Sequence, residues 1–145
     1  MDVKQAPDKN LAFELLRVTE SAALAAARWL GKGAKEDGDG AAVDAMRLSF
    51  DSISVRGRIV IGEGAKDEAP MLYNGELVGD GSGPEIDIAV DPVEGTNLLA
   101  LGRPNSIAVI GACKAGGMYN PGSSYYMKKL VVGPAARDVV DIDAP

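Results

Sequence analysis

Residues 86–96 read Ile-Asp-Ile-Ala-Val-Asp-Pro-Val-Glu-Gly-Thr, and this stretch decides the fold. Its apolar first half is typical of a short strand that stops at the carboxylate of Asp91, and Pro92 then fixes a turn. Glu94 follows three residues after Asp91. Two acids at the mouth of a buried strand repel each other and lose solvation, so they need a positive charge between them. The stretch therefore predicts a divalent cation at the two acids, with the hydroxyl and N–H groups of residues 95–96 facing an anion.

The composition of the 145-residue chain excludes several classes of protein. A hydrophobic share of 46% is enough for the core of one domain, and a net charge of −6 argues against nucleic acid or an anionic membrane as partner. There is no apolar run of about 18 residues, and the N-terminus lacks the order of a signal peptide. Cys113 is the only cysteine, so we expect a cytoplasmic protein in which this thiol is buried and structural.

The chain contains no histidine. This excludes triads that use histidine, zinc held by histidine, and histidine acid–base catalysis. Hydrolytic chemistry in this chain therefore depends on carboxylates, hydroxyls, lysines and a metal ion. Oxygen ligands of this hard type favour Mg²⁺ or Mn²⁺.

The first third of the chain has the spacing of two amphipathic helices. We expect a flexible N-terminus over residues 1–9, a helix over 10–30, a charged loop over 31–40 and a second helix over 39–53. The apolar positions that define the two inner faces are Leu11, Leu15, Val18, Ala22, Ala25 and Trp29, then Val43, Met46, Phe50 and Ile53.

The rest of the chain favours strands. The predicted strands cover residues 58–62, 85–90, 106–114, 125–132 and 138–142, and residues 71–78 are predicted to form a strand or a hairpin. Two helices followed by strands predict an α/β layered domain, over residues 10–145, with the helices packed on a mixed, largely antiparallel sheet. Because the chain stops directly after a strand with no closing helix, we expect an incomplete fold.

Two more acids stand at the ends of predicted elements. Asp39 begins the second helix, where an N-cap role also explains it, and Glu63 ends a strand, where a solvated turn residue is the alternative. Carboxylates at separate element ends converge in two-metal sites. Thr96 fits both the N-cap of a short helix over residues 97–101 and a group that faces a phosphate or its attacking water, and the two roles are compatible.

Taken together, these motifs resemble the class II fructose-1,6-bisphosphatases, within the metal-dependent, lithium-sensitive sugar phosphatase superfamily. The Asp-Pro-x-Glu-Gly-Thr core marks the superfamily, and Gly-Glu-Gly with Asp-Glu-Ala-Pro-Met-Leu-Tyr makes the resemblance specific to the class. The matching segments are residues 17–24, 29–31, 39–47, 59–64, 67–73, 87–96 and 126–130.

The resemblance implies a role for each matching residue. Metal ions would be held by Asp39, Glu63, Asp91 and Glu94, and a sugar bisphosphate would be bound by Glu94, Gly95, Thr96 and Tyr126. The implied catalytic residues are Thr96, Glu63 and Asp91.

The activity implied is metal-dependent hydrolysis of the 1-phosphate of fructose 1,6-bisphosphate, a step of gluconeogenesis, in a homo-oligomer with Mg²⁺ or Mn²⁺ as cofactor. Two alternatives stay open: a sedoheptulose 1,7-bisphosphatase or dual enzyme, and an inactive fragment or non-catalytic sugar-phosphate-binding remnant. The family's catalytic domain is longer than this chain, so we expect the chain to be its N-terminal part and to be inactive alone.

Overall fold

The structure, a computed structural model, describes residues 11–65, 71–122, 124 and 128–144. The predicted flexible segment over residues 1–9 lies outside them. The elements in chain order are α1 (Leu11–Ala27), α2 (Lys35–Phe50), β1 (Arg56–Ile61), β2 (Leu77–Val78), β3 (Glu85–Glu94), α3 (Thr96–Ala100), β4 (Ile107–Lys114) and the 3₁₀ turn η1 (Pro134–Ala136).

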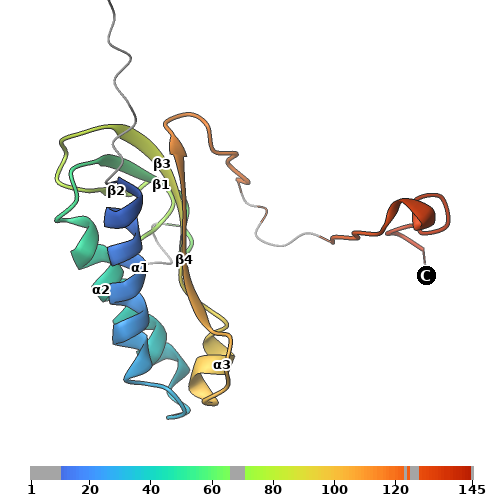
Figure 1. Cartoon of the computed structure of the whole chain (residues 1–145), viewed down its shortest axis with the longest axis horizontal. Helices are drawn as coiled ribbons and strands as arrows, with labels where there is room; N and C mark the ends of the chain where they lie inside the picture. The colour runs from blue at the N-terminus through green and yellow to red at the C-terminus, as the bar shows by residue number, and fades with distance from the viewer. Residues whose placement is uncertain (1–10, 66–70, 123, 125–127, 145) are drawn as a thin grey trace, which may run out of the picture.

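The four strands form one mixed sheet in the order β2-β1-β3-β4. β3 pairs parallel with β1 and antiparallel with β4, and β1 pairs antiparallel with β2. Helices α1 and α2 lie side by side on one face of this sheet (Figure 1). The predicted α/β architecture, with helices on a mixed and largely antiparallel sheet, is therefore confirmed.

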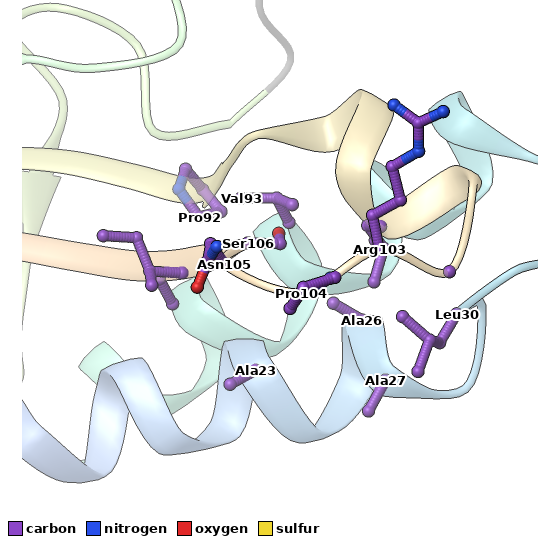
Figure 2. A pocket seen from close by; sticks show the side chains of 14 residues that line it. Ala23, Ala26, Ala27, Leu30, Pro92, Val93, Arg103, Pro104, Asn105 and Ser106 are labelled. Atoms are coloured by element: carbon purple, nitrogen blue, oxygen red, sulfur yellow. The ribbon is translucent and has the colours of Figure 1, made fainter.

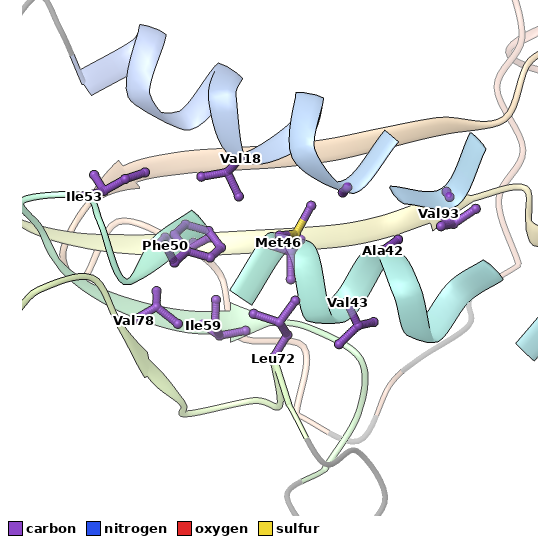
Figure 3. Packing of buried hydrophobic residues seen from close by; sticks show 14 of the residues in the cluster. Val18, Ala42, Val43, Met46, Phe50, Ile53, Ile59, Leu72, Val78 and Val93 are labelled. Carbon is purple, nitrogen blue, oxygen red and sulfur yellow. The ribbon is translucent and has the colours of Figure 1, made fainter. Parts of the chain in front are cut away.

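The core lies between the two helices and the sheet (Figure 3). The predicted inner face of α2 is correct, because Val43, Met46 and Phe50 are buried there and Ile53 is buried just beyond its end. α1 contributes its buried Val18, and its small buried alanines allow close packing against α2. This core fixes α2 against β3, which is the relation that the candidate site depends on.

The second helix begins earlier than predicted. α2 starts at Lys35 with Ala34 as its N-cap, so the charged loop is shorter and the predicted N-cap role of Asp39 is wrong. Gly38 is buried in the first turns of this helix, and a Cβ atom there would lie 2.8 Å from a methyl carbon of Leu99. Tertiary packing thus overrides the poor helix propensity of glycine, because its missing side chain lets α3 approach α2.

The central strand is longer than predicted, since β3 continues through Asp91 and Pro92 to Glu94. Pro92 is fully buried within the strand and does not form the predicted turn. Cys113 lies on β4, at the sheet edge, and is half-buried, so the expectation of a buried thiol is wrong.

The predicted strands near the C-terminus are absent from the described residues 128–144. Residues 138–142 lie in turns or have no regular structure, and residues 128–132 have no regular structure. The turn η1 lies away from the helices and the sheet (Figure 1). Residues 125–127, the start of one predicted strand, lie outside the described residues. Of residues 71–78, predicted to form a strand or a hairpin, only Leu77 and Val78 pair as a strand. In these segments the β-branched residues satisfy the strand pattern, but they find no neighbouring strand in the described structure.

A bilayer crossing requires a helix that is both long and apolar. None of the described helices meets both requirements.

Replacing Phe50 by Ala tests the core. Phe50 is fully buried, so we expect the change to lower the free energy of unfolding by about 3–5 kcal/mol, measured by urea denaturation. Leu48 on the same helix is 72% exposed, and Leu48→Ala should change stability by less than about 0.5 kcal/mol. Equal effects of the two substitutions would contradict the placement of α2.

Candidate functional site

A pocket of about 720 Å³ opens at the carboxyl end of β3. The predicted site residues that line it are Asp39, Glu63, Asp91, Glu94, Gly95 and Thr96. They come from α2, from the segment after β1, from β3 and from α3. The seventh, Tyr126, lies outside the described residues. Elements that are far apart in the sequence thus bring the predicted acids to one pocket.

A register shift in β3 places Asp91 and Glu94 at the same pocket. In a regular strand, residues three positions apart point to opposite faces of the sheet. Here Asp91 pairs with Val109 and Glu94 with Ile107, so three steps along β3 (91 to 94) match two along β4 (109 to 107). The extra residue is a β-bulge, which reverses the alternation beyond it. Both acids therefore reach the pocket that a regular strand would divide between them.

The Gly95–Thr96 corner connects β3 to α3. Gly95 has a φ of 85°, a left-handed conformation that glycine adopts without strain, and it is the N-cap of α3. Its carbonyl accepts hydrogen bonds from the N–H groups of Leu98 and Leu99, while the Ser106 hydroxyl donates to the Glu94 carbonyl at 3.2 Å. Thr96 is the first residue of the helix, so its predicted role as N-cap is wrong. The corner nevertheless places Thr96 on the pocket wall.

Asp39 lies in the second turn of α2 and lines the pocket. Burial raises the pKa of Asp39, the nearby Glu36 raises it further, and Lys35 lowers it. Lys35 also lines the pocket, four residues before Asp39 on the same helix. Sequence reasoning missed this lysine, because the helix was predicted to begin only at Asp39.

Glu63 has the largest perturbation among these acids. Its pKa is raised to about 7, first by burial and then by the negative charges of Asp39 and Asp91. The pKa of Asp91 is also raised, chiefly by burial, then by the charge of Glu94 and a hydrogen bond to it, with a smaller contribution from Asp39. The carboxylates of three separate elements therefore act on one another electrostatically.

Other residues on the pocket wall carried no signal in the sequence. Asn74 lines the pocket between β1 and β2, and residues 121, 122 and 124 reach it after β4. Asp87 of β3 holds the beginning of the segment that follows β4. Its buried carboxylate accepts hydrogen bonds from the N–H groups of Gly116 at 2.7 Å and Met118 at 3.2 Å. The only sign of this contact in the sequence is that Asp87 is a single acid between the apolar residues Ile86 and Ile88.

The donor chemistry of the pocket fits a hard divalent cation. Five carboxylates line the pocket, those of Asp39, Glu63, Asp91 and Glu94 and that of Glu36, which the sequence did not single out. Burial and neighbouring negative charge raise the pKa of Asp39, Glu63 and Asp91, and a bound cation removes this penalty on their ionised forms. Within the part of the chain that the structure describes, no three acidic or cysteine side chains form a group that holds a metal ion as they stand. The described acids are thus an open set of candidate ligands rather than a closed coordination shell.

A second pocket, of about 490 Å³, lies on the other side of Pro92 and Val93. Alanines of α1 face these two residues, whereas Arg103 points away (Figure 2). None of the described residues that line it carries a carboxylate, and most are apolar. Its chemistry does not suit a metal ion, so the acidic pocket is the candidate site.

Comparisons with known proteins identify the family of the chain. The sequence matches the family described as bacterial fructose-1,6-bisphosphatase, glpX-encoded, over residues 9–145. It is 52% identical over 137 residues to the fructose-1,6-bisphosphatase 1 class 2 of Escherichia coli. The matched residues make up 94% of this chain and 40% of that protein. The fructose-1,6-bisphosphatase class 2 of Shigella flexneri matches with the same identity and coverage. The chain thus spans 40% of the length of these curated relatives.

The raised pKa of Glu63 predicts how stability depends on pH without metal. The pKa of Glu63 is about 7 in the folded protein against an ordinary 4.5. The folded protein therefore loses stability as the pH rises through this interval, because Glu63 must ionise. In EDTA, Glu63→Gln should therefore be more stable than the unchanged protein at about pH 8 and nearly equal at about pH 5, measured by urea denaturation. Glu14→Gln, on the exposed side of α1, is the control. A stability difference that does not grow with pH would contradict the burial of Glu63 among acids.

Proposed function

The chain belongs to the family of bacterial, glpX-encoded fructose-1,6-bisphosphatases, and from this premise we propose that its acidic pocket takes part in bisphosphatase catalysis. The proposed reaction is hydrolysis of the 1-phosphate of fructose 1,6-bisphosphate to fructose 6-phosphate and phosphate. The observation that carries the proposal is that Asp39, Glu63, Asp91 and Glu94 line one pocket together with Thr96.

The four carboxylates would hold Mg²⁺ or Mn²⁺, and both ions prefer such oxygen ligands. When bound, such ions lower the pKa of a coordinated water and neutralise charge on the phosphate. Asp91 and Glu94 contribute from the same strand because the bulge turns both toward the pocket. Asp39 contributes from the second turn of α2 and Glu63 from the segment after β1, so the ligands reach the pocket from three sides.

The phosphate would meet the Gly95–Thr96 corner. The Thr96 hydroxyl offers a hydrogen bond to a phosphate oxygen or to the attacking water, and Gly95 leaves the backbone free of a side chain there. Lys35 adds a positive charge on the pocket wall beside Asp39, which offsets part of the negative charge of the acids there and offers a partner to a phosphate.

The other expectations for the whole protein stay predictions. These are a gluconeogenic role, a cytoplasmic location, a homo-oligomer, and the absence of nucleic acid and membrane partners. No feature of the described pocket favours sedoheptulose 1,7-bisphosphate over fructose 1,6-bisphosphate, so both sugars belong in the test.

Removing one carboxylate tests the proposal. Because the chain spans 40% of the relatives' length, the assay uses a chimera in which this chain replaces the matched 137 residues of the Escherichia coli protein. With Mn²⁺, Asp91→Asn and Glu94→Gln should each lower kcat/KM for fructose 1,6-bisphosphate at least about 100-fold, since changes to mere supporting groups of a metal site already cost about 10–100-fold. Phosphate release on both sugars is measured.

Glu85→Gln is the matched control, because Glu85 is an exposed acid at the opposite end of the same strand. It should keep near-normal turnover. Near-normal activity of Asp91→Asn or Glu94→Gln would refute the assignment. Faster turnover of sedoheptulose 1,7-bisphosphate would replace the substrate and keep the site, and strong activity of the 145-residue chain alone would contradict the expectation that it is inactive.

A further inference from the structure

The turn over residues 71–76 packs against the backbone that carries Glu63. Three hydrogen bonds join the two segments. The Gly62 N–H donates to the side-chain Oδ1 of Asn74 at 2.8 Å, the Glu63 N–H donates to the Leu72 carbonyl at 3.0 Å, and the Asn74 N–H donates to the Gly64 carbonyl at 2.9 Å. The backbone is therefore held immediately before, at and after Glu63.

The contact between these two segments leaves no space for a side chain at Gly62. A Cβ atom on Gly62 would lie 2.0 Å from the Leu72 carbonyl oxygen, so the segments touch backbone to backbone. Leu72 itself is fully buried and has a φ of 55°, an uncommon conformation for a leucine. The close contact fixes the distance between the segments, whereas the Asn74 amide fixes how Gly62 is oriented.

The turn is also anchored to the helix that carries Asp39. Glu76 is buried, and its carboxylate accepts a hydrogen bond from Arg47 Nε of α2 at 3.1 Å and another from the Tyr73 N–H at 3.2 Å. Arg47 and Asp39 lie on the same helix. The turn therefore connects two of the elements that supply acids to the pocket.

We propose that Asn74 is a positioning residue for the acidic pocket: its side-chain amide fixes the Gly62–Gly64 backbone so that the Glu63 carboxylate faces Asp39 and Asp91. Asn74 itself lines the same pocket, so the bond to Gly62 forms at the pocket wall. This inference rests on the proposed function, because a fixed Glu63 matters only if the acids act together on a cation. A misplacement of about 1 Å is enough to weaken such a site strongly.

The alternative role for Asn74 is that of an ordinary turn residue, whose side chain stabilises a turn and nothing more. Two measurements separate the roles. A structural role changes the thermal unfolding midpoint in EDTA, whereas a positioning role changes the affinity for a cation. Mn²⁺ alone is the probe, measured by titration calorimetry and by its electron paramagnetic resonance signal, with this chain in the chimera of the activity assay.

Asn74→Leu removes the accepting oxygen and Asn74→Asp keeps it. We expect Asn74→Leu to weaken Mn²⁺ binding about 10-fold or more, as loss of an outer support does in metal sites, and Asn74→Asp to bind as the unchanged chain does or more tightly. Asp80→Leu is the matched control, because the Asp80 carboxylate accepts the Ser82 N–H at 2.7 Å in another turn, and Asp80 does not line the pocket. It should lower the unfolding midpoint without changing Mn²⁺ affinity.

The outcomes are distinct. Unchanged Mn²⁺ affinity in Asn74→Leu, with normal binding by the unchanged chain, overturns the role of Asn74 and leaves the proposed function standing. Absence of Mn²⁺ binding in the unchanged chain overturns the metal site and this inference with it. If Asn74→Leu does not fold, Asn74→Ser replaces it, since a serine hydroxyl is too short to reach the Gly62 N–H, and the same loss of affinity is expected. An equal loss in Asn74→Asp also overturns the inference.

Discussion

Burial and mutual repulsion of the carboxylates at the carboxyl end of β3 act against the folded state, and the fold must oppose them. Burial and neighbouring negative charge raise the pKa values of Asp39, Glu63 and Asp91, so the folded chain loses stability when these groups ionise. The apolar core offsets this loss of stability, because each of these acids is close in sequence to residues that are buried in the core. Ile59 comes before Glu63, and Val90 comes directly before Asp91. The fold therefore uses hydrophobic packing to hold together charges that would otherwise separate.

The parts of the site that were predictable from sequence are those that one short segment specifies. The apolar run before Asp91 identifies a buried strand, and Asp91, Glu94 and Thr96 lie close enough in sequence to share one end of it. Pairing with two neighbours then makes this strand the centre of the sheet. The helical faces were predictable for the same reason, since the periodic burial of residues such as Met46 and Phe50 depends on local spacing alone.

The parts that were not predictable depend on contacts between distant segments. Glycines at positions 38 and 40 indicate a loop by propensity, but both lie inside α2, and Leu99 approaches Gly38 so closely that a side chain there would clash. Lys35 lines the pocket as the first residue of α2, one turn before Asp39 on the same helix. Asn74 looked like part of a strand, yet its position is set by Gly62 and by the Arg47–Glu76 ion pair. No pattern within one segment contains this information.

The bulge in β3 shows why a correct motif gave an incorrect local structure. The sequence suggested that Pro92 ends the strand, because proline has no N–H to donate to a sheet. The paired register with β1 stops at Ala89, and the pairing with β4 is irregular between Asp91 and Glu94, so Pro92 sits where no regular ladder bond is required. The proline therefore favours the irregularity rather than a turn. Without the extra residue, the alternation of the strand would place one of the two acids on the opposite face, so the bulge is what converts two neighbouring carboxylates into one site.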